Sequence, residues 1–419
     1  MKTTPCTIAI LLACLAVPSA VAESPIKSGD RIAIVGNTFA DQLRIHGYLE
    51  TQLMQHWPDN PVSIRNLGWG GDMLTARDRP TGFPTEQETL TEHHTDVIVA
   101  CFGMGESFSG AAGLSDFRDQ VNAFIQSHAG KKYNGESDVR LILVSPIAHE
   151  QLGELTPGQE QRDQDLALYS KAMGDVAVAA NVPFIDLYQP SRYLMDERQG
   201  PKLTTNGIHL NPYGYWAISH FFFRDLVRDD LDSIQGASIQ GPWQMFIDAA
   251  DLVTTTRAVD VSGLTRTDQG LAFRVTERVA PTLPPPSDQK LPPPLNHLRD
   301  SLTITHLQPG NYQLSVDGKP VTTASAQEWA GGVAIDQSPA HSAADGLRRS
   351  INDKNLQFTY SWKALNQVHI VGERKGSPSG RALPSEVIEF NKIANERDAK
   401  LRLGMQLQTR DWRLNRVLE

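Results

Sequence analysis

Cysteine is scarce in this sequence, which excludes a fold held together by disulfide bonds. Three cysteines occur among 419 residues, and Cys6 and Cys14 both fall in an apolar N-terminal stretch. Only Cys101 lies in the body of the chain, inside the run DVIVACFG, where it is expected to be a small buried side chain. We therefore expect no intrachain disulfide, and a hydrophobic core must hold the fold.

A surplus of basic residues is also lacking. The 39 lysines and arginines are outnumbered by 48 acidic residues, which gives a net charge of −9. Proteins that bind phosphate backbones need a positive surface, so no nucleic-acid partner is expected. Long apolar runs are missing as well, because the run at residues 8–17 is shorter than the roughly 20 residues that span a bilayer. We expect no stable membrane span.

The first 22 residues have the pattern of a signal peptide. Lys2 provides positive charge, residues 8–17 form a short apolar core, and Ala20-Val21-Ala22 fits a cleavage site of small residues. The pattern predicts an exported protein, periplasmic or extracellular. The stretch LLAC, ending at Cys14, offers lipoprotein processing as a less favoured alternative, because the apolar stretch before it is very short.

Residues 28–232 alternate short apolar runs with amphipathic stretches. Apolar runs without alternation are typical of parallel strands buried on both faces. Such a pattern predicts an α/β domain in which a doubly wound parallel sheet lies between two layers of helices. The expected strands are RIAIVG, VSIRNLG, DVIVACFG, RLILVSP and VPFIDL, and the expected helices cover residues 115–129, 165–180 and 211–227.

The pattern of polar and apolar residues changes after residue 235. Residues 235–340 alternate polar and apolar side chains and contain turn signals, which predicts a β-rich accessory domain. The proline-rich stretch APTLPPPSDQKLPPPL is expected to be an extended connector within it. Residues 341–419 are predicted to form a helical C-terminal segment.

Polar and glycine-rich loops follow the first four predicted strands of the first domain, and a further such loop leads into its last predicted helix. Ligands of open parallel sheets bind at the carboxyl ends of the strands, so these loops predict a site there. No metal is expected, because HEQLGE departs from the H-E-x-x-H pattern at Gly153. No cofactor is expected either. The loops are GNT at 36–38, NLGWGGD at 66–72, FGMGES at 102–107, SPIAHE at 145–150 and NGIHLN at 206–211.

The order of these loops resembles the SGNH (GDSL-type) hydrolases, in particular a divergent branch of exported bacterial proteins. In that family a G-D-S turn holds the nucleophilic serine, a glycine and a G-x-N-D asparagine complete the oxyanion hole, and D-x-x-H supplies an aspartate and the base. The resemblance covers roughly half of the chain by the usual size of such domains. It implies Thr38, His209 and Asn206 as catalytic residues, and Thr38, Gly71 and Gly105 as the oxyanion hole, with Gly71 favoured among the glycines of residues 68–71.

Three positions depart from the family pattern. Thr38 replaces serine, and its methyl group stiffens the side chain and crowds the path of attack. Gly105 replaces the oxyanion asparagine, a loss that typically costs roughly 10²–10³ in kcat. Asn206 replaces the orienting aspartate, which can cost on the order of 10⁴ because an amide holds the wrong histidine tautomer. A standard Ser-His-Asp mechanism is therefore not encoded.

Other polar or aromatic residues of these loops are candidates for substrate contacts. Four of them have a structural alternative: an N-cap for Asn37, the core for Trp69, and a surface pair for His149 and Glu150. Asp72 or Glu106 could instead orient His209. The candidates are Asn37, Trp69, Asp72, Glu106, His149 and Glu150.

Two main hypotheses follow. In the first, the protein is an esterase that hydrolyses acyl or acetyl esters outside the cytoplasm, on a small molecule or a polysaccharide. In the second, it is a catalytically impaired SGNH fold that binds carbohydrate in the same cleft. A third hypothesis, a structural or assembly component, would use the β-rich domain for docking. The sequence names no protein partner.

Overall fold

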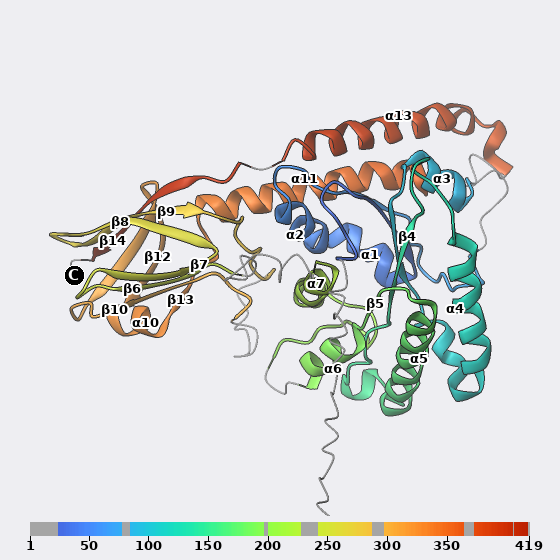
Figure 1. Cartoon of the computed structure of the whole chain (residues 1–419), viewed down its shortest axis with the longest axis horizontal. Coiled ribbons are helices and arrows are strands. Elements are labelled where there is room, and N and C mark those ends of the chain that lie inside the picture. The colour runs from blue at the N-terminus through green and yellow to red at the C-terminus, as the bar shows by residue number, and fades with distance from the viewer. Residues whose placement is uncertain are drawn as a thin grey trace, which may run out of the picture.

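The computed structural model describes residues 24–77, 84–196, 200–227, 242–286, 297–363, 373–404 and 406–417. These residues form an α/β unit and a β-rich unit, with two long helices running along the α/β unit (Figure 1). The expected signal peptide lies outside the described residues.

A five-stranded parallel sheet is the centre of the α/β unit, as the apolar runs predicted. The strands lie in the order β2-β1-β3-β4-β5. β2 is added on one side of β1, and β3, β4 and β5 are added in turn on its other side, so the strand order reverses between β1 and β3. Every strand pairs in parallel with its neighbours. The strands are β1 (Arg31–Gly36), β2 (Ser63–Asn66), β3 (Val97–Cys101), β4 (Arg140–Val144) and β5 (Phe184–Ile185).

Helices cover both faces of this sheet, and each layer has its own apolar core. One core joins the sheet to α1, α2 and α7, and the other joins it to α3, α4 and α5. The three-layer α/β/α fold is confirmed. The helices are α1 (Thr38–His46), α2 (Tyr48–His56), α3 (Glu86–Glu92), α4 (Leu114–His128), α5 (Gln159–Ala180), α6 (Tyr188–Asp196) and α7 (Pro212–Leu226).

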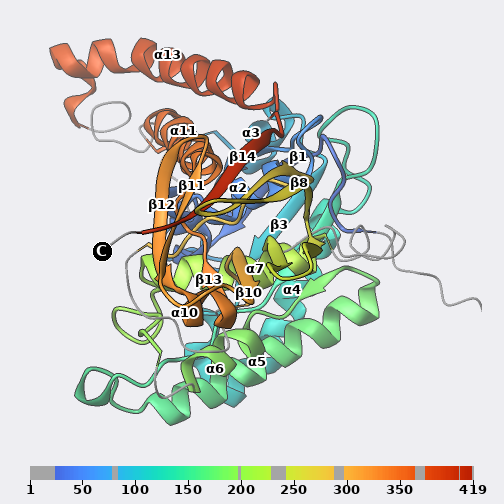
Figure 2. The same ribbon diagram turned by 90° about the vertical axis from the view of Figure 1, so that its left-hand side faces the viewer.

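The β-rich unit is a sandwich of two sheets around one core. The sheets have the orders β13-β10-β6-β7 and β12-β11-β14-β9-β8, and buried side chains of both form one core. Figure 2 views the ribbon of this unit from the side that lies on the left in Figure 1. Its elements are β6 (Gln244–Asp248), β7 (Val253–Arg257), β8 (Val259–Thr267), β9 (Gly270–Glu277), β10 (Ser301–Thr305), β11 (Asn311–Val316), β12 (Lys319–Ser325), α10 (Ala326–Gly331) and β13 (Val333–Ala334).

The C-terminal segment differs from the helical prediction at its end. Helices α11 (Pro339–Trp362) and α13 (Pro378–Leu401) form as expected, but β14 (Thr409–Arg416) returns to the sandwich and pairs with β9 and β11. In β14, Trp412 and Leu414 are buried and alternate with more exposed neighbours. This period of two is the strand signal that the adjoining helical patterns obscured.

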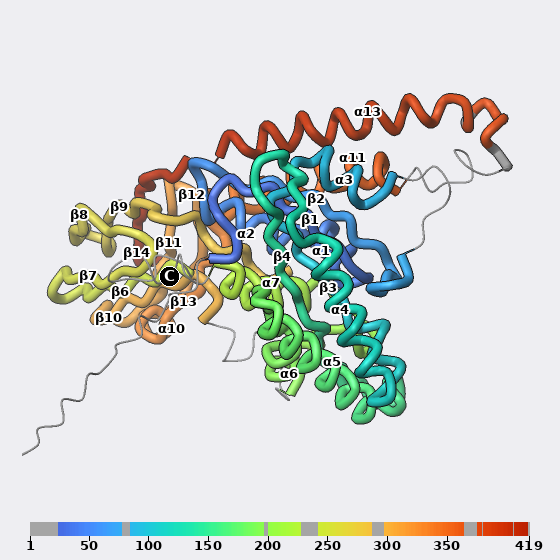
Figure 3. The backbone as a smooth tube through the Cα atoms, turned by 45° about the vertical axis from the view of Figure 1, so that its right-hand side comes forward, coloured from blue at the N-terminus to red at the C-terminus, as the bar shows by residue number. Residues whose placement is uncertain are grey.

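Helix α11 leaves the β-rich unit and runs along the α/β unit, with α13 lying beside it (Figures 1 and 3). Lys354 of α11 is fully buried and donates to a Glu50 carboxylate oxygen of α2 and, at 2.8 Å, to the Ile64 carbonyl. A buried ammonium needs such partners to offset its lost hydration. The C-terminal helices are thus part of the packed structure of the α/β unit. No helix within the described residues is long and apolar enough to cross a membrane.

Candidate active site

The turn after β1 brings Thr38 to the carboxyl end of the sheet, where the strand order reverses. Gly36 has φ 132°, and a side chain there would meet the Cys101 carbonyl oxygen of β3 at 2.1 Å, so only glycine fits. Asn37 is the N-cap of α1: its Oδ1 accepts the Phe39 N–H at 3.0 Å. The side-chain oxygen of Asn37, a candidate substrate contact, therefore has a structural use.

Thr38 is the first residue of α1 and is half-buried. Its side chain makes no hydrogen bond within the part of the chain that the structure describes. The backbone N–H groups of a first helical turn lack intrahelical partners and favour nearby negative charge. The hydroxyl therefore lies at a helix N-terminus, where nearby negative charge is favoured.

The loop after β2 lies against this turn. Trp69 N–H donates to the Gly36 carbonyl at 2.9 Å, and a Cβ atom on Gly70 would come within 3.6 Å of the Thr38 hydroxyl oxygen. Asp72 N–H donates to the Trp69 carbonyl at 3.1 Å, which closes a turn in which Gly71 has φ 89°. That conformation requires glycine at Gly71, whether or not its N–H serves an oxyanion.

Two candidate contacts of this loop already have neighbours in the protein. The Lys363 ammonium, just after α11, lies 4.7 Å from the centre of the Trp69 ring, so one face of that ring is engaged in a cation–π contact. Asp72 is buried, with only 5% of its surface exposed. A sugar ring would have to stack on the other face of Trp69.

In the loop after β3, Gly105 stands where the family has its oxyanion asparagine, and a longer side chain there would meet Met73. Gly105 has φ −68° and ψ −44°, a conformation open to any residue. A Cβ atom there would lie 2.7 Å from Met73 Cγ and 2.9 Å from its sulfur. Met73 thus occupies the space beside Gly105 into which an asparagine side chain would extend.

Glu106 joins the loops after β2 and β3 to each other. One carboxylate oxygen accepts the Leu74 N–H at 2.8 Å, and the other accepts the Gly103 N–H at 2.9 Å. Burial raises the pKa of Glu106 against the lowering effect of these hydrogen bonds. Both oxygens serve the backbone, so Glu106 is positioned to shape the loops.

Glu150 has a similar role at the loop after β4. It is 2% exposed, and its carboxylate accepts the backbone N–H groups of Leu203 and Thr204, the latter at 2.8 Å, and the Thr204 hydroxyl at 2.6 Å. Its own N–H donates to the Gly207 carbonyl at 2.8 Å. These bonds fix the loop that carries His209.

His149 packs against the same loop. A side chain on Gly207 would lie 2.4 Å from His149 Cε1, so the imidazole fills the space that this glycine leaves. Burial lowers the pKa of His149, and the nearby Arg162 adds to this effect. His149 is half-buried and is expected to be a neutral imidazole in this position.

His209 lies in a short exposed hairpin closed by a bridge between Thr204 and Leu210. The Asn206 side chain holds the ring: its Nδ2 lies 3.0 Å from His209 Nδ1. The orientation of this amide is set by its oxygen, which accepts the backbone N–H groups of His209 at 2.9 Å and Ile208 at 3.4 Å.

This arrangement determines which ring nitrogen carries the proton. Because an amide nitrogen can only donate, Nδ1 of His209 must accept, and the proton of the neutral ring lies on Nε2. A general base of the SGNH type needs the opposite tautomer, with Nε2 free to take a proton from the nucleophile. Asn206 thus holds His209 in the tautomer that cannot accept that proton at Nε2.

The hairpin leads directly into α7, which packs on α1. The Tyr215 hydroxyl of α7 donates to the Phe39 carbonyl at 3.2 Å, next to Thr38. The hairpin and the Thr38 turn are therefore linked through α7 at one end of the sheet. Two cavities, of about 330 and 340 Å³, lie elsewhere, since neither is lined by Thr38 or His209.

A scan of family models matches residues 29–217 to the GDSL-like lipase/acylhydrolase family. The resemblance inferred from the loop order is confirmed, and the match supports an esterase-type function. A search of curated proteins finds no match.

Several solved structures are similar to this chain at low sequence identity, and the first of those given next shares its fold. A gut microbial diltiazem-metabolizing enzyme is similar with a TM-score of 0.67 and 17% identity, over 94% of this chain and 99% of that one. An acetylxylan esterase from Geobacillus stearothermophilus (a catalytic mutant) covers 48% of this chain and 96% of its own, with 15% identity and a TM-score of 0.38. A hydrolase from the metagenome of Lake Arreo, Spain, covers 48% of this chain and 97% of its own, with 17% identity and a TM-score of 0.38.

Sequence reasoning missed two residues that shape the candidate site. Met73 carries no motif, and its position over Gly105 depends on how two loops pack. Arg162 of α5 reaches across to the Ser107 carbonyl and hydroxyl, both at 3.0 Å. Its sequence context, EQRDQD, has the composition of a solvated helix face, so no signal marked it. Among the described residues, no cluster of three or more His, Cys, Asp or Glu side chains could hold a metal ion.

Proposed function

We propose that the protein is an ester hydrolase with an attenuated catalytic site, in which Thr38 attacks and His209 serves as base. The contact between Asn206 Nδ2 and His209 Nδ1 carries this proposal, because it positions the imidazole while assigning its proton to Nε2. The match to the GDSL-like family supports the reaction class.

In the proposed reaction, the Thr38 oxygen attacks the ester carbonyl and its proton passes to Nε2 of His209. The backbone N–H groups of Thr38 and Gly71 would stabilise the developing oxyanion. The alcohol leaves with the proton returned by His209, and water then releases the acid by the same route. Turnover requires His209 to reach the less favoured tautomer first, so its rate is limited by Asn206.

The proposed substrates are acyl or acetyl esters carried by a large molecule such as a polysaccharide. Asn206 and His209 are both exposed in the hairpin, so an ester on a bulky chain can approach them. The export expected from residues 1–22 would bring the protein to such substrates. An ester-bearing small molecule would reach the same position.

The test measures acetate release from acetylated xylan and hydrolysis of p-nitrophenyl acetate by the purified protein. Thr38→Ala and His209→Ala should each abolish the low activity of the unmodified chain. Activity that survives both substitutions would show that the reaction, if any, takes place elsewhere.

The same contact favours a second candidate, a domain that binds ester-bearing carbohydrate without turning it over. A nucleophile paired with a histidine in the wrong tautomer can hold a ligand and leave it intact. Binding of acetylated xylan oligosaccharides by calorimetry, with no acetate released even after prolonged incubation, would favour this candidate over the hydrolase.

A further inference from the structure

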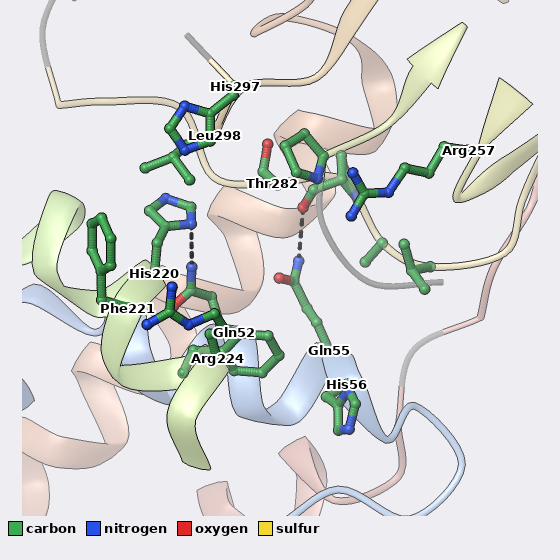
Figure 4. A pocket seen from close by; sticks show the side chains of 15 residues that line it. Gln52, Gln55, His56, His220, Phe221, Arg224, Arg257, Thr282, His297 and Leu298 are labelled. Carbon is green, nitrogen blue, oxygen red and sulfur yellow. Dashed lines mark hydrogen bonds between the residues drawn. The ribbon is translucent and has the colours of Figure 1, made fainter. Parts of the chain in front are cut away.

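A cavity of about 330 Å³ lies between the α/β unit and the β-rich unit, and neither Thr38 nor His209 lines it (Figure 4). Helices α2 and α7 form one side, and β7 with residues 279–282 and 297–298 forms the other. Its volume is within the range of roughly 300–1,000 Å³ of small-molecule sites, which are common where two units meet. The cavity is therefore a candidate site for a small ligand.

Hydrogen bonds from the α/β unit hold one wall of this cavity in place. Gln55 Nε2 of α2 donates to the Pro281 carbonyl at 3.3 Å. Trp216 Nε1 of α7 donates to the Leu283 carbonyl at 2.8 Å. Both donors belong to buried side chains. The segment that forms this wall is thus attached to the two helices opposite it, so the cavity is formed before any ligand enters.

Arginine provides all the formal charge among the side chains that line the cavity. Arg224 of α7 and Arg257 of β7 both line it, and no aspartate or glutamate of the described chain does. The chain as a whole has 48 acidic and 39 basic residues, so the charge of this wall is opposite in sign to the net charge. An anion that enters the cavity meets positive charge on its surface, which favours binding.

Two carboxylates bond to lining residues without lining the cavity themselves. Asp225 accepts the Arg224 Nε–H at 2.9 Å, which offsets part of the charge of that arginine. Asp300 accepts the Thr282 N–H at 2.9 Å, and it is fully buried and also bonds to a ring nitrogen of His341 at 2.9 Å. With two arginines against one partly exposed carboxylate, the balance of charge at the cavity stays positive.

Both guanidinium groups have donors for a ligand oxygen, since an arginine carries five N–H groups. Arg224 uses only its Nε, for Asp225, in hydrogen bonds with the described part of the chain. Arg257 interacts with the protein, and Figure 4 shows its guanidinium directed toward the middle of the lining residues. A carboxylate suits such a group, because two parallel N–H donors match its two oxygens.

The histidines at the cavity do not add charge near neutral pH. Burial, with a smaller effect from the neighbouring His297, lowers the pKa of His220 to about 4. Burial also lowers the pKa of His297. Both rings are therefore uncharged near pH 7, and attraction of an anion depends on Arg224 and Arg257.

An apolar surface lies beside these charges. Phe221, Phe223, Val279 and Leu298 contribute it. The guanidinium carbon of Arg224 lies 5.4 Å from the centre of the Phe221 ring, so the charged and apolar parts of the wall adjoin. A ligand with a ring next to its anionic group would contact both parts at once. An inorganic anion would use the charges and leave the apolar surface in contact with water.

We propose that this cavity is a binding site for a small aromatic carboxylate. Its carboxylate would bind Arg224 and Arg257, and its ring would lie against Phe221, Phe223 and Leu298. Because the walls come from both units, the ligand would contact both of them. The site is separate from the proposed ester-hydrolysing site and does not rest on that function.

Benzoate is a suitable probe, because it joins one carboxylate to one ring. Benzamide is the matched control that keeps the ring and the shape without the charge, and acetate keeps the charge without the ring. In saturation-transfer NMR titrations of the purified full chain near pH 7, benzoate should bind saturably and roughly tenfold tighter than either control. The affinity for benzoate should also fall as salt is added, because salt screens the arginine charges.

Four variants test the assignment. Arg224→Gln and Arg257→Gln should each weaken benzoate binding roughly tenfold and leave benzamide binding unchanged, because each removes only a charge. Arg257→Lys keeps a charge and should bind benzoate more tightly than Arg257→Gln. Arg274→Gln is the matched control: it removes the charge of an exposed arginine of β9 outside the cavity and should leave benzoate binding unchanged. Circular dichroism verifies that each variant is folded.

If Arg257→Gln does not fold, Arg224→Gln still decides, because the Arg224 side chain is 56% exposed and its replacement is expected to be tolerated. Equal binding of benzoate and benzamide would show that the arginines do not select an anion. Equal binding of benzoate and acetate would show that the ring is not recognised. Either result would overturn the proposal, as would benzoate binding that is unchanged by Arg224→Gln or that never saturates in the unmodified chain.

Discussion

Substitution of Asn206 by aspartate is expected to increase ester hydrolysis, which is unusual for a change at a catalytic position. In the structure, Asn206 Oδ1 accepts two backbone N–H groups, and Nδ2 lies 3.0 Å from His209 Nδ1. Aspartate has the same shape, so one oxygen can keep the backbone bonds. The other can accept Nδ1–H, which frees Nε2 to take the proton of Thr38.

The expected gain in rate depends on how exposed residue 206 and His209 are to solvent. A carboxylate and an imidazolium about 4 Å apart attract by ~1 kcal/mol in water and ~4 kcal/mol at the effective dielectric constant of a protein surface. Since each 1.36 kcal/mol is tenfold in rate, the range runs from about fivefold to about 10³-fold. We expect about 10²-fold, below the roughly 10⁴ of a buried triad, because both residues are exposed.

The assay compares kcat/KM for p-nitrophenyl acetate in the unmodified chain and in Asn206→Asp. Asn211→Asp is the matched control: it adds the same charge two residues after His209, at the N-cap of α7, where an aspartate also caps well. If Asn206→Asp gains no more than Asn211→Asp, the tautomer reasoning is wrong. A gain that persists after Thr38→Ala would also refute it.

Three further predictions concern the surroundings of the site and the stability of the fold. Glu106→Gln should lower the free energy of unfolding by about 1–3 kcal/mol, because one of its two backbone donors then faces an amide N–H; an unchanged urea midpoint would contradict this. Gly105→Asn should destabilise the chain by displacing Met73. The double variant Gly105→Asn/Met73→Ala should fold normally and raise kcat by up to about 10²-fold, because the asparagine adds an oxyanion donor. Equal stability of the two variants would argue against the clash. Because burial holds the pKa of His220 at about 4, the unfolded chain binds more protons below pH 6.5, and stability should fall as pH decreases from 6.5 to 4. The slope should be smaller in His220→Phe by up to about 1.4 kcal/mol per pH unit, and identical slopes in urea titrations would refute the contribution of this histidine.

Much of the fold could be predicted from the sequence because its signals are local. Unbroken apolar runs such as RIAIVG require burial on both faces, and that alone predicts a parallel sheet between helices. The sheet edge then collects the loops in a fixed order. The C-terminal strand β14 was harder to predict, because it pairs with strands more than 90 positions away in the sequence, as in the pairing of Leu414 with Leu314.

The chemistry of the site was only partly readable for a different reason. The loop order gives the positions of Thr38, Asn206 and His209, but not where their side-chain atoms point. Glu106 and Glu150 look like acids available to a substrate, and the structure directs their carboxylates to backbone N–H groups instead. Such pairings depend on the packing of separate loops, which no spacing along the chain encodes.

The central claim, that Thr38 is a nucleophile restrained by Asn206, can be tested by covalent trapping. The unmodified chain and Asn206→Asp are incubated with an alkyl fluorophosphonate, and the labelled peptide is identified by mass spectrometry. We predict a phosphonate on Thr38 in both proteins, formed faster in Asn206→Asp and not formed in His209→Ala. A label on another residue, or equal rates in all three proteins, would contradict the account.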